Sequence, residues 1–413
     1  MKLLMFTQYF PPETGAPQAR LYELAIRLKA AGHQVRILTA MPNYPRGRVF
    51  DGYRGRLVVK ENQNGLDVVR TAIWPSISKS FLPRFLSYCS FVLSSLMLGF
   101  RAAGSTEVVL LESPPIFLCV SGVVLSRLRG ARLILMVSDI WPDILVRMGS
   151  VRAGPLLSAM LALESWAYRN STLVAVTNPG ARRQLRERFP YLQTAVISNG
   201  VDLSLFRPGL RSKRIRSMLG GEESTFLIGY CGLHGIAQGL AVVVDAAILL
   251  RHLDGVKFVM VGDGPTKQDL VDRVERCGLR NIGFYESRPK DEIPAIVASC
   301  DAGVVPLSCR LPGTMPSKVY EVLAAGTPVL IAKGCEGERL VSEHRVGMSF
   351  EPGSGRELAD AIMKMIDLKG EINSMRSRCR SVAERFDRNI IAIRTERILL
   401  AVARGQVPQE DEE

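Results

Sequence analysis

The segment PSKVYE (residues 316–321) carries residue types that bind a phosphorylated ligand. Pro316 suits the first turn of a helix, which places Ser317 and Lys318 where free backbone N–H groups and the positive end of the helix dipole favour phosphate. Glu321 follows one turn later, and a carboxylate there can accept two hydrogen bonds from ribose hydroxyls. Ser317, Lys318 and Glu321 are therefore candidate nucleotide ligands. A capped surface helix with a solvated Lys and Glu is the alternative.

A glycine-rich turn, GYCGLHGIAQGL (residues 229–240), joins a strand-like run to a helical pattern. Glycines let backbone N–H groups approach a phosphate closely, and the spacing of these differs from the dinucleotide fingerprint. We expect Gly232 to contact the phosphates and His234 to hydrogen-bond a phosphate or sugar oxygen. The alternative is a tight turn with a surface or core histidine.

Two segments of the first half could contribute to the same chemistry. Gly15 lies between the first strand-like run and a helix, so it could close over a diphosphate or be a simple loop glycine. SDIWPD (residues 138–143) ends another strand-like run with Asp139 and Asp143, placed for acid/base work or hydroxyl binding, and with Trp141 as an apolar platform for a sugar. Asp143 could instead cap the next helix. No Asp-x-Asp site or His-rich cluster supports a catalytic divalent metal.

These candidate residues follow strands in a repeating strand–helix pattern, which predicts an α/β protein with mostly parallel sheets. The predicted strands of the first half are residues 3–10, 34–40, 108–112, 132–139 and 173–177, with a helix over residues 18–33. Those of the second half are residues 226–232, 256–264, 281–286, 302–306 and 327–332, with helices over 239–252, 265–277 and 316–325.

The 413 residues suggest two or slightly more domains. Asn-Gly and Pro-Gly turns at residues 198–209 mark the boundary. We predict an N-terminal Rossmann-like domain over residues 1–200, a second over 201–385, and a C-terminal helix with an acidic tail over 386–413 that packs back on the first domain. Ligands of such doubly wound sheets bind beyond the carboxyl ends of the strands, so a cleft between two facing domains is the expected site.

The positive charge is confined to the first half. Residues 1–200 hold 24 Lys and Arg against 11 Asp and Glu, whereas the rest of the chain holds 29 of each. Such asymmetry indicates an anionic partner, either a phosphorylated ligand or an anionic bilayer, unless it serves solubility alone. Nucleic acid is not expected, since no binding motif or interleaved aromatic–basic patch accompanies the charge. The eight scattered cysteines indicate reduced thiols in a cytosolic protein.

Residues 85–100 have no charge and are flanked by Arg84 and Arg101. At about 1.5 Å per residue the run spans roughly 24 Å, short of the ~30 Å hydrocarbon core of a bilayer. It is therefore either a buried core helix or an interfacial helix lying on a membrane.

Together these segments resemble the retaining glycosyltransferases of family 4, which have the two-domain GT-B fold. The resemblance covers nearly the whole chain, and within the family the chain is similar to bacterial N-acetylfucosaminyltransferase-like proteins of O-antigen and exopolysaccharide assembly. The motifs that carry it are FTQYFPPETGAP, ISNGVDLSLFRP, YCGLHGIAQGL, MVGDGP and PSKVYEVLAAGTPVL.

The chain departs from the family pattern at two places. Many members have a Glu-x7-Glu pair, and the position of the first Glu is Gly313 here. The family often has an Arg and a Lys near the glycine turn that carries His234 and Gln238 in this chain. The diphosphate contacts must then depend on Lys318, backbone N–H groups and His234.

The resemblance implies a nucleotide-sugar donor, UDP-linked, and a retaining transfer that needs no metal or other cofactor. Lys318 would stabilise charge on the leaving phosphate, His234 would assist, and Asp139 would orient the acceptor. The implied acceptor is an undecaprenyl-diphosphate-linked saccharide, so we expect a cytoplasmic protein bound peripherally to the anionic inner face of the cell membrane. A non-hydrolysing UDP-sugar 2-epimerase and a non-catalytic nucleotide-sugar- or lipid-binding protein are the alternatives.

Overall fold

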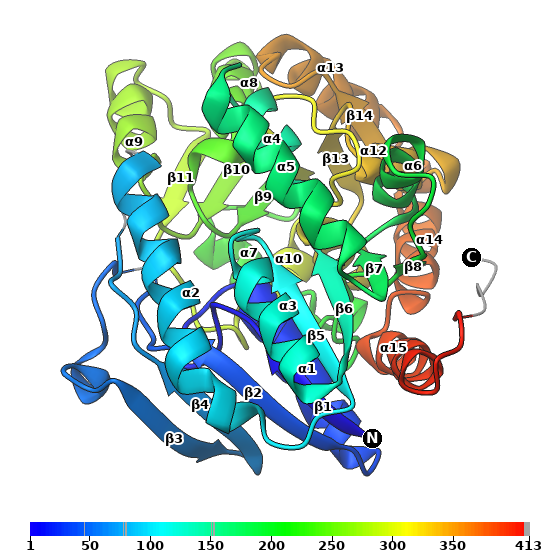
Figure 1. The fold of residues 1–413 in the computed structure, drawn as a ribbon. Helices are drawn as coiled ribbons and strands as arrows, with labels where there is room; N and C mark the ends of the chain where they lie inside the picture. Colours follow the sequence, from blue (N-terminus) through cyan, green and yellow to red (C-terminus); the bar gives the residue numbers. More distant parts are fainter. Residues whose placement is uncertain (45, 77, 79–80, 150, 152, 409–413) are drawn as a thin grey trace. The chain divides into compact units, whose positions relative to one another are not determined.

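The computed structural model describes residues 1–408 except 45, 77, 79–80, 150 and 152, and the chain forms two compact units (Figure 1). Unit 1 comprises Met1–Val146, Val151–Asn199 and Arg388–Glu413. Unit 2 comprises Arg147–Ser150 and Gly200–Asp387.

Unit 1 is built on a sheet of eight strands in the order β3-β4-β2-β1-β5-β6-β7-β8, counted over the described residues. All neighbouring strands pair in parallel except β3 and β4. The strands are β1 Lys2–Phe6, β2 Gln34–Ala40, β3 Val58–Gln63, β4 Leu66–Thr71, β5 Val108–Ser113, β6 Arg132–Val137, β7 Leu173–Val176 and β8 Thr194–Val196. The order reverses between β1 and β5, which is the switch point of this sheet.

Helices cover both faces of the unit 1 sheet because side chains alternate along each strand. Leu4 and Phe6 of β1 pack in one core with α2, α3, α5 and α6, whereas Leu3 and Met5 pack in the other with α1 and α15. The helices are α1 Ala16–Ala30, α2 Phe81–Ala103, α3 Leu118–Arg129, α4 Asp143–Arg147, α5 Pro155–Arg169, α6 Pro179–Arg188 and α15 Arg388–Ala403. In Figure 1, α2 and α3 cross in front of the sheet.

Unit 2 has a sheet of six strands, all parallel, in the order β11-β10-β9-β12-β13-β14, again over the described residues. The strands are β9 Phe226–Cys231, β10 Val256–Val261, β11 Ile282–Tyr285, β12 Ala302–Val305, β13 Val329–Ala332 and β14 Gly347–Phe350. The helices are α7 Lys213–Met218, α8 Ala241–Leu249, α9 Lys267–Arg276, α10 Ile293–Ser299, α11 Lys318–Ala324, α12 Glu336–Glu343, α13 Gly355–Asp367 and α14 Ile372–Glu384. Its switch point lies between β9 and β12.

The predicted α/β class with two doubly wound sheets is confirmed, and each predicted strand corresponds to an observed one. Sequence reading missed β3, β4, β8 and β14, which are short or polar. Within the segment predicted as a C-terminal helix, residues 386–413, the structure has α15, and α14 ends just before it at Glu384. Helix α15 packs in unit 1 beside α1, and the ion pair between Arg388 and Glu23 of α1 joins the two helices.

Candidate active site

The candidate residues of unit 2 gather where β9 and β12 meet, at the switch point of its sheet. A small, mainly apolar pocket there has Lys318 and Glu321 of α11 as its charged residues. The rest of its lining is Gly229, Cys231, Val297, Cys300, Gly303, Val304 and Val322. Ligands of open parallel sheets bind at such a crevice, beyond the carboxyl ends of the strands. Two motifs almost 90 residues apart in sequence therefore meet at one place.

The Lys318 side chain passes across the glycine turn that follows β9. Its Nζ lies 5.4 Å from the centre of the Tyr230 ring, and a side-chain carbon at Gly232 would collide with this Nζ. Gly232 also has φ 148°, a conformation that other residues rarely adopt. The Tyr230 hydroxyl donates to the Leu233 carbonyl oxygen at 2.6 Å and fixes the turn. The sequence therefore needs glycine at 232 so that the ammonium group can reach the turn.

Ser317 immediately precedes α11, which begins at Lys318 and has seven residues. The Ser317 hydroxyl makes no capping hydrogen bond to the helix, which differs from the capped surface helix that the sequence also allowed. Ser317, Lys318 and Glu321 are all partly buried rather than freely solvated. Lys318 and Glu321 thus present one cationic and one anionic group on the same pocket wall.

His234 is enclosed in this structure, which differs from its prediction as a donor-contacting residue. Its side chain has no exposed surface and packs against Tyr230 and Phe284, with ring centres 5.7 and 6.0 Å away. Burial lowers the pKa of His234 to about 4, with Lys267 and Lys318 adding to the effect and Asp263 opposing it. The imidazole is therefore neutral at pH 7 and is no cationic phosphate ligand in this conformation.

The backbone of His234 ties the turn after β9 to the turn after β10. Its N–H donates to the Asp263 carbonyl oxygen at 2.8 Å, and its carbonyl oxygen accepts from the Thr266 N–H at 3.0 Å. Side chains at Gly262 or Gly264 would strike the backbone of the first turn. The VGDGP motif thus supports the glycine turn by close backbone packing.

Asp139 of unit 1 lies just beyond the carboxyl end of β6 and is half-buried. Burial raises the pKa of Asp139 to about 6, the neighbouring Glu112 carboxylate adds to the rise, and Arg20 opposes it. Its carboxylate accepts no hydrogen bond from any part of the chain that the structure describes. Asp139 therefore combines a perturbed pKa with free hydrogen-bonding capacity, a combination frequent at functional sites.

Sequence reading missed the polar network beside Asp139. Glu112, the fifth residue of β5, accepts from Arg20 Nη2 at 2.5 Å and from Ser138 Oγ at 2.6 Å. Arg20 Nη1 donates to Asn199 Oδ1 at 2.5 Å. The partners are 26 to 179 residues apart, so no local spacing links them. The one signal was Glu112 itself, a charged residue at the end of the apolar run VVLL.

Gly15 is the residue that precedes α1, and its φ of 165° is extended backbone that any residue adopts. A side chain at this position would collide with the amide group of Gln18. The loop around Gly15 is held by Glu13, which accepts from the backbone N–H groups of Asn43 and Tyr44, both at 2.8 Å. Glycine is therefore favoured here because the Gln18 side chain lies close to its Cα, and not because of its backbone conformation.

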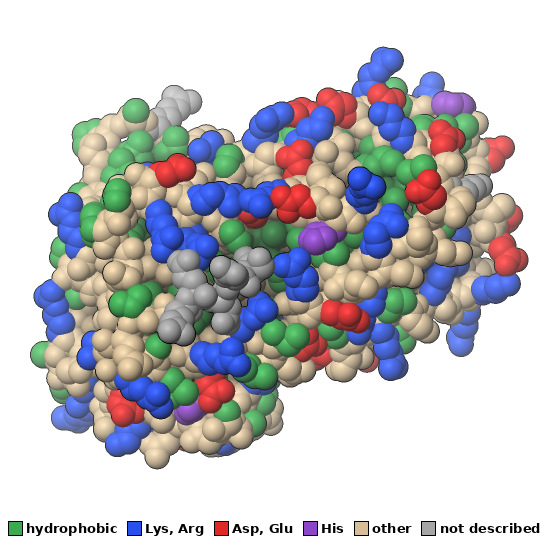
Figure 2. All heavy atoms as spheres, turned by 90° about the vertical axis from the view of Figure 1, so that its right-hand side faces the viewer, with side chains coloured by type: hydrophobic (Ala, Val, Ile, Leu, Met, Phe, Trp, Pro, Cys, Tyr) green, Lys and Arg blue, Asp and Glu red, His purple; other side chains and the backbone are tan. Residues whose placement is uncertain are grey.

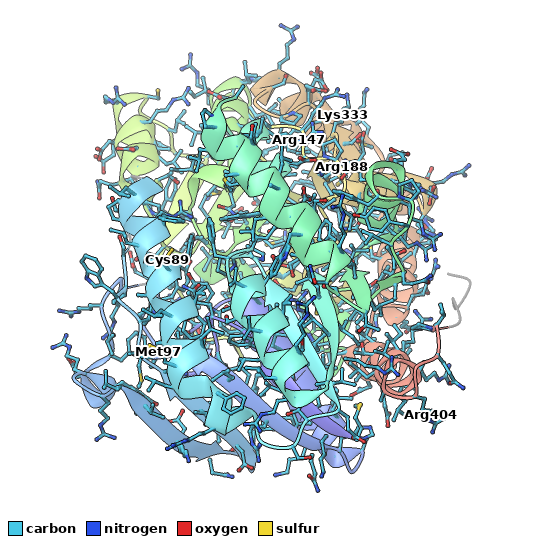
Figure 3. The ribbon with its side chains drawn as sticks, in the orientation of Figure 1. Cys89, Met97, Arg147, Arg188, Lys333 and Arg404 are labelled. Atoms are coloured by element: carbon cyan, nitrogen blue, oxygen red, sulfur yellow. The ribbon has the colours of Figure 1, made fainter. Side chains whose placement is uncertain are left out.

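Trp141 and Asp143 take structural positions. Trp141 is buried, with its ring edge-on to Tyr88 at 6.4 Å, so it does not form the exposed sugar platform that the sequence suggested. Asp143 is the first residue of α4 and accepts from Arg188 Nη1 at 3.0 Å. Arg188, labelled in Figure 3, also donates to the buried Glu164 at 2.6 Å. Asp143 therefore links α4 to the ends of α5 and α6.

Helix α2 has two different faces. Ser87, Phe91, Ser95 and Gly99 recur every four residues and are buried against the sheet and α3. The residues on the opposite side are exposed and apolar, namely Leu82, Leu86, Leu93 and Met97. At 100° per residue they form one stripe, and Cys89 and Met97 can be followed along the helix in Figure 3.

The helix is longer than the charge-free run from which it was predicted. Its 23 residues span about 35 Å at 1.5 Å per residue, and Leu82–Arg101 has a mean hydropathy of 1.2, so it is long and apolar enough to cross a membrane. Only 22% of that window is buried, so α2 is not the enclosed core helix that was one of the two expectations. One face of α2 packs on the sheet, and the opposite face is exposed.

Lys and Arg side chains are spread over the face of the molecule drawn in Figure 2. No group of three or more His, Cys, Asp or Glu side chains arranged to hold a metal ion occurs among the residues described.

Known proteins match both units. Residues 15–200 match the model of the glycosyl transferase 4-like domain, and residues 212–386 match that of the glycosyl transferases group 1. The putative colanic acid biosynthesis glycosyl transferase WcaI of Escherichia coli (strain K12) is 26% identical over 340 residues, which are 80% of this chain and 83% of the relative. The probable glycosyltransferase WbjE of Pseudomonas aeruginosa is 25% identical over 287 residues, 67% of this chain and 70% of the relative.

Solved structures share the fold. Sucrose-phosphate synthase from Thermosynechococcus elongatus superposes with a TM-score of 0.79 at 17% identity and covers 98% of this chain and 100% of its own. HepE from Anabaena in complex with UDP has a TM-score of 0.71 at 20% identity and covers 97% of this chain and 100% of its own. The chain therefore belongs to the glycosyltransferases with the GT-B fold, with a glycosyl transferase 4-like domain followed by a group 1 domain.

Proposed function

We propose that this glycosyltransferase is a retaining, metal-independent enzyme that transfers a sugar from a UDP-linked donor to a lipid-diphosphate-linked saccharide during O-antigen or exopolysaccharide synthesis. The observation that carries the proposal is Lys318 Nζ lying against the glycine turn at Gly232, with Glu321 on the same pocket wall. The match to the colanic acid protein WcaI supports a polysaccharide product.

Donor binding follows from the chemistry of this pocket. The Lys318 ammonium group would hold the diphosphate, and the Glu321 carboxylate would accept hydrogen bonds from the ribose hydroxyls. When the glycosidic bond breaks, negative charge grows on the leaving phosphate, so a cation fixed at the turn stabilises the transition state more than the ground state. The UDP complex of HepE, a protein with the same fold, supports UDP as the donor nucleotide.

Acceptor binding is proposed for unit 1. The Asp139 carboxylate has no partner among the residues described, and at pH 7 it is mostly ionised because its pKa is about 6. It can accept a hydrogen bond from the attacking hydroxyl and orient it. In the retaining mechanism that the family resemblance implies, the leaving phosphate helps to deprotonate that hydroxyl, so Asp139 need not act as an obligate base.

The lipid anchor of the acceptor would bring the enzyme to the anionic inner face of the cell membrane. The exposed stripe of α2 supports this docking, and Leu128 of α3, a helix that packs beside α2, is also exposed. Arg84 and Arg101 at the ends of the stripe and the positive charge of residues 1–200 complement anionic lipid headgroups. We therefore place the protein in the cytoplasm, bound peripherally.

Nucleotide release tests the proposal. The wild-type chain is incubated with UDP-, GDP- and ADP-sugars, including UDP-N-acetyl-L-fucosamine, with and without a membrane lipid extract that contains lipid-linked saccharides. We expect UDP release that depends on the extract and is lost in Lys318→Ala and Glu321→Ala variants that remain folded. Isomerised donor without an acceptor would instead identify an epimerase, and tight donor binding without turnover would identify a binding protein.

A further inference from the structure

Arg20 and Glu112 form a buried ion pair beside Asp139, at the switch point of the unit 1 sheet. Arg20 Nη2 contacts Glu112 Oε1 at 2.5 Å and Ser138 Oγ at 3.0 Å. Glu112 Oε1 also accepts from Ser138 Oγ at 2.6 Å. The pair thus joins the first turns of α1 to the end of β5 and to the residue that precedes Asp139.

Both terminal nitrogens of the Arg20 guanidinium donate hydrogen bonds. Its Nη1 donates to Asn199 Oδ1 and its Nη2 to Glu112 and Ser138. Two carboxylates therefore lie near one guanidinium, and Glu112 makes the direct hydrogen bond. Asp139, the next residue after Ser138, receives only its electrostatic influence.

We propose that Glu112 is a positioning residue: by engaging Arg20 it keeps the guanidinium off Asp139 and leaves that carboxylate free to orient the acceptor hydroxyl. This inference rests on the proposed function. An Arg20–Asp139 ion pair would satisfy the carboxylate within the protein, and a hydroxyl would then have to compete with a charge-assisted hydrogen bond, which is about twice as strong as a neutral one.

Two further atoms of the network have hydrogen-bonding capacity that the described residues do not use. Glu112 Oε2 and Arg20 Nε are buried and have no hydrogen-bond partner within the described part of the chain. Buried polar atoms are usually paired, and an unpaired one destabilises the fold. A sugar hydroxyl both donates and accepts, so a hydroxyl-rich ligand beside Asp139 would satisfy atoms of both kinds.

A structural role alone is the competing explanation, since the ion pair also joins α1 to β5. The two explanations predict different directions for the shifts in the Asp139 titration midpoint. The charged groups that act on Asp139 are Glu112 from β5, which raises its pKa, and Arg20 from α1, which lowers it. Glu112→Gln should therefore lower the midpoint of Asp139 titration and Arg20→Met should raise it, whereas loosening of the packing would move both midpoints in the same direction.

The test follows the Asp139 carboxyl directly, on the full chain without substrates. Protein labelled with ¹³C-aspartate is titrated by infrared spectroscopy, and the Asp139 band is identified by its loss in Asp139→Asn. We expect the midpoint to fall by about one pH unit in Glu112→Gln and to rise by a similar amount in Arg20→Met. Glu164→Gln is the matched control, since Glu164 is another buried carboxylate of unit 1 paired with an arginine, Arg188.

Transfer kinetics then test the consequence for the acceptor. Glu112→Gln should raise the KM for the lipid-linked acceptor about tenfold, shift the acid limb of the pH profile in the direction of the infrared midpoint, and leave the donor KM unchanged. An unchanged midpoint in Glu112→Gln, or a shifted midpoint with unchanged acceptor KM and pH profile, would overturn the proposal. If the wild-type chain transfers no sugar, the proposed function fails, whereas the infrared titration still decides whether Glu112 and Arg20 act oppositely on Asp139.

Discussion

Asp139 in unit 1 and Asp301 in unit 2 are both aspartates next to a parallel strand, but their surroundings are opposite. Asp301 precedes the amino end of β12, and it accepts from Arg211 at 2.7 Å, Arg216 at 2.8 Å and the Leu227 N–H at 2.9 Å. Asp139 follows the carboxyl end of β6 and has no such partner in the described residues. The aspartate at the amino end of its strand, Asp301, stabilises the fold. The aspartate at the carboxyl end of its strand, Asp139, lies where ligands of parallel sheets bind.

The pKa shifts of the two aspartates follow this difference. Burial acts to raise the pKa of Asp301, but hydrogen bonds from Leu227, Arg216 and Arg211 outweigh it, and the net shift is downward. For Asp139 burial is not compensated, and its pKa rises to about 6. The charged form of Asp301 is therefore favoured by folding, whereas that of Asp139 is disfavoured.

The largest effect is expected at Asp301. Asp301→Asn removes the charge that pairs the buried Arg216 and the more exposed Arg211, and breaking a buried pair costs about 3–5 kcal/mol. Because the pKa of Asp301 is lowered in the fold, its contribution is present above the unfolded pKa of ~3.8 and is lost as pH falls through the lower folded value. Urea unfolding from pH 7 to pH 3 should show the stability difference between wild type and variant shrinking in acid. A constant difference would contradict this assignment.

A substitution at Gly232 tests whether the carboxyl end of the unit 2 sheet serves transfer, as the amino end at Asp301 serves stability. Gly232→Val places a side chain on Lys318 Nζ at a positive φ, so the ammonium must leave the turn, and transfer should fall about 100-fold, as when one transition-state donor is removed. The measurement is the initial rate of UDP release. Gly255→Val is the control, since a side chain there meets nothing within 4 Å; equal losses in both variants would refute a specific role for the turn.

Asp139→Asn should lower transfer but stabilise the fold at neutral pH. A shift from 3.8 to about 6 corresponds to ~3 kcal/mol, and partial exposure reduces this to about 2 kcal/mol. Because the pKa of Asp139 is raised in the fold, its ionisation destabilises the wild type. The free energy of unfolding of the wild type is unaffected at low pH and falls as pH rises from the unfolded pKa through about 6. The gain of the variant, measured by urea unfolding, should therefore vanish near pH 4. A destabilised variant at pH 7 would show that Asp139 is structural.

The smallest effect concerns the apolar stripe of α2. Met97→Asp removes a side chain that is 71% exposed, and partial burial of a methionine in a bilayer accounts for about 1 kcal/mol, or roughly fivefold in binding. Flotation with vesicles containing anionic lipid should show this loss. Met218→Asp, at a methionine of unit 2 that is 52% exposed, should bind as wild type does. Equal binding by both variants would remove α2 from the proposed docking surface.

The sequence predicted which candidate residues of unit 2 lie together better than it did for unit 1, for a physical reason. The glycine turn and the segment that carries Lys318 and Glu321 are local motifs, and parallel strands necessarily bring their carboxyl ends together. The network around Asp139 is made by Arg20, Glu112 and Ser138, whose partnership depends on strand order and not on spacing. The edge strand β3 and its neighbour β4 escaped prediction because they lack a continuous apolar run.

Burial was the other property that motifs could not show. His234 lies in a glycine turn typical of phosphate binding, yet its ring is enclosed by Tyr230 and Phe284 from two different strands. Trp141 has the type and position of a sugar platform, but Tyr88 of α2 covers its edge. In both cases a residue distant in sequence, Phe284 for His234 and Tyr88 for Trp141, helps to cover the side chain.

The most direct test of the central claim, that unit 2 binds the nucleotide and unit 1 orients the acceptor, is a calorimetric titration of UDP into three proteins. The account predicts that Lys318→Ala weakens UDP binding at least tenfold relative to wild type, while Asp139→Asn binds UDP with unchanged affinity. Unchanged affinity in Lys318→Ala, or a loss in Asp139→Asn as large as that in Lys318→Ala, would contradict the assignment of the nucleotide to unit 2.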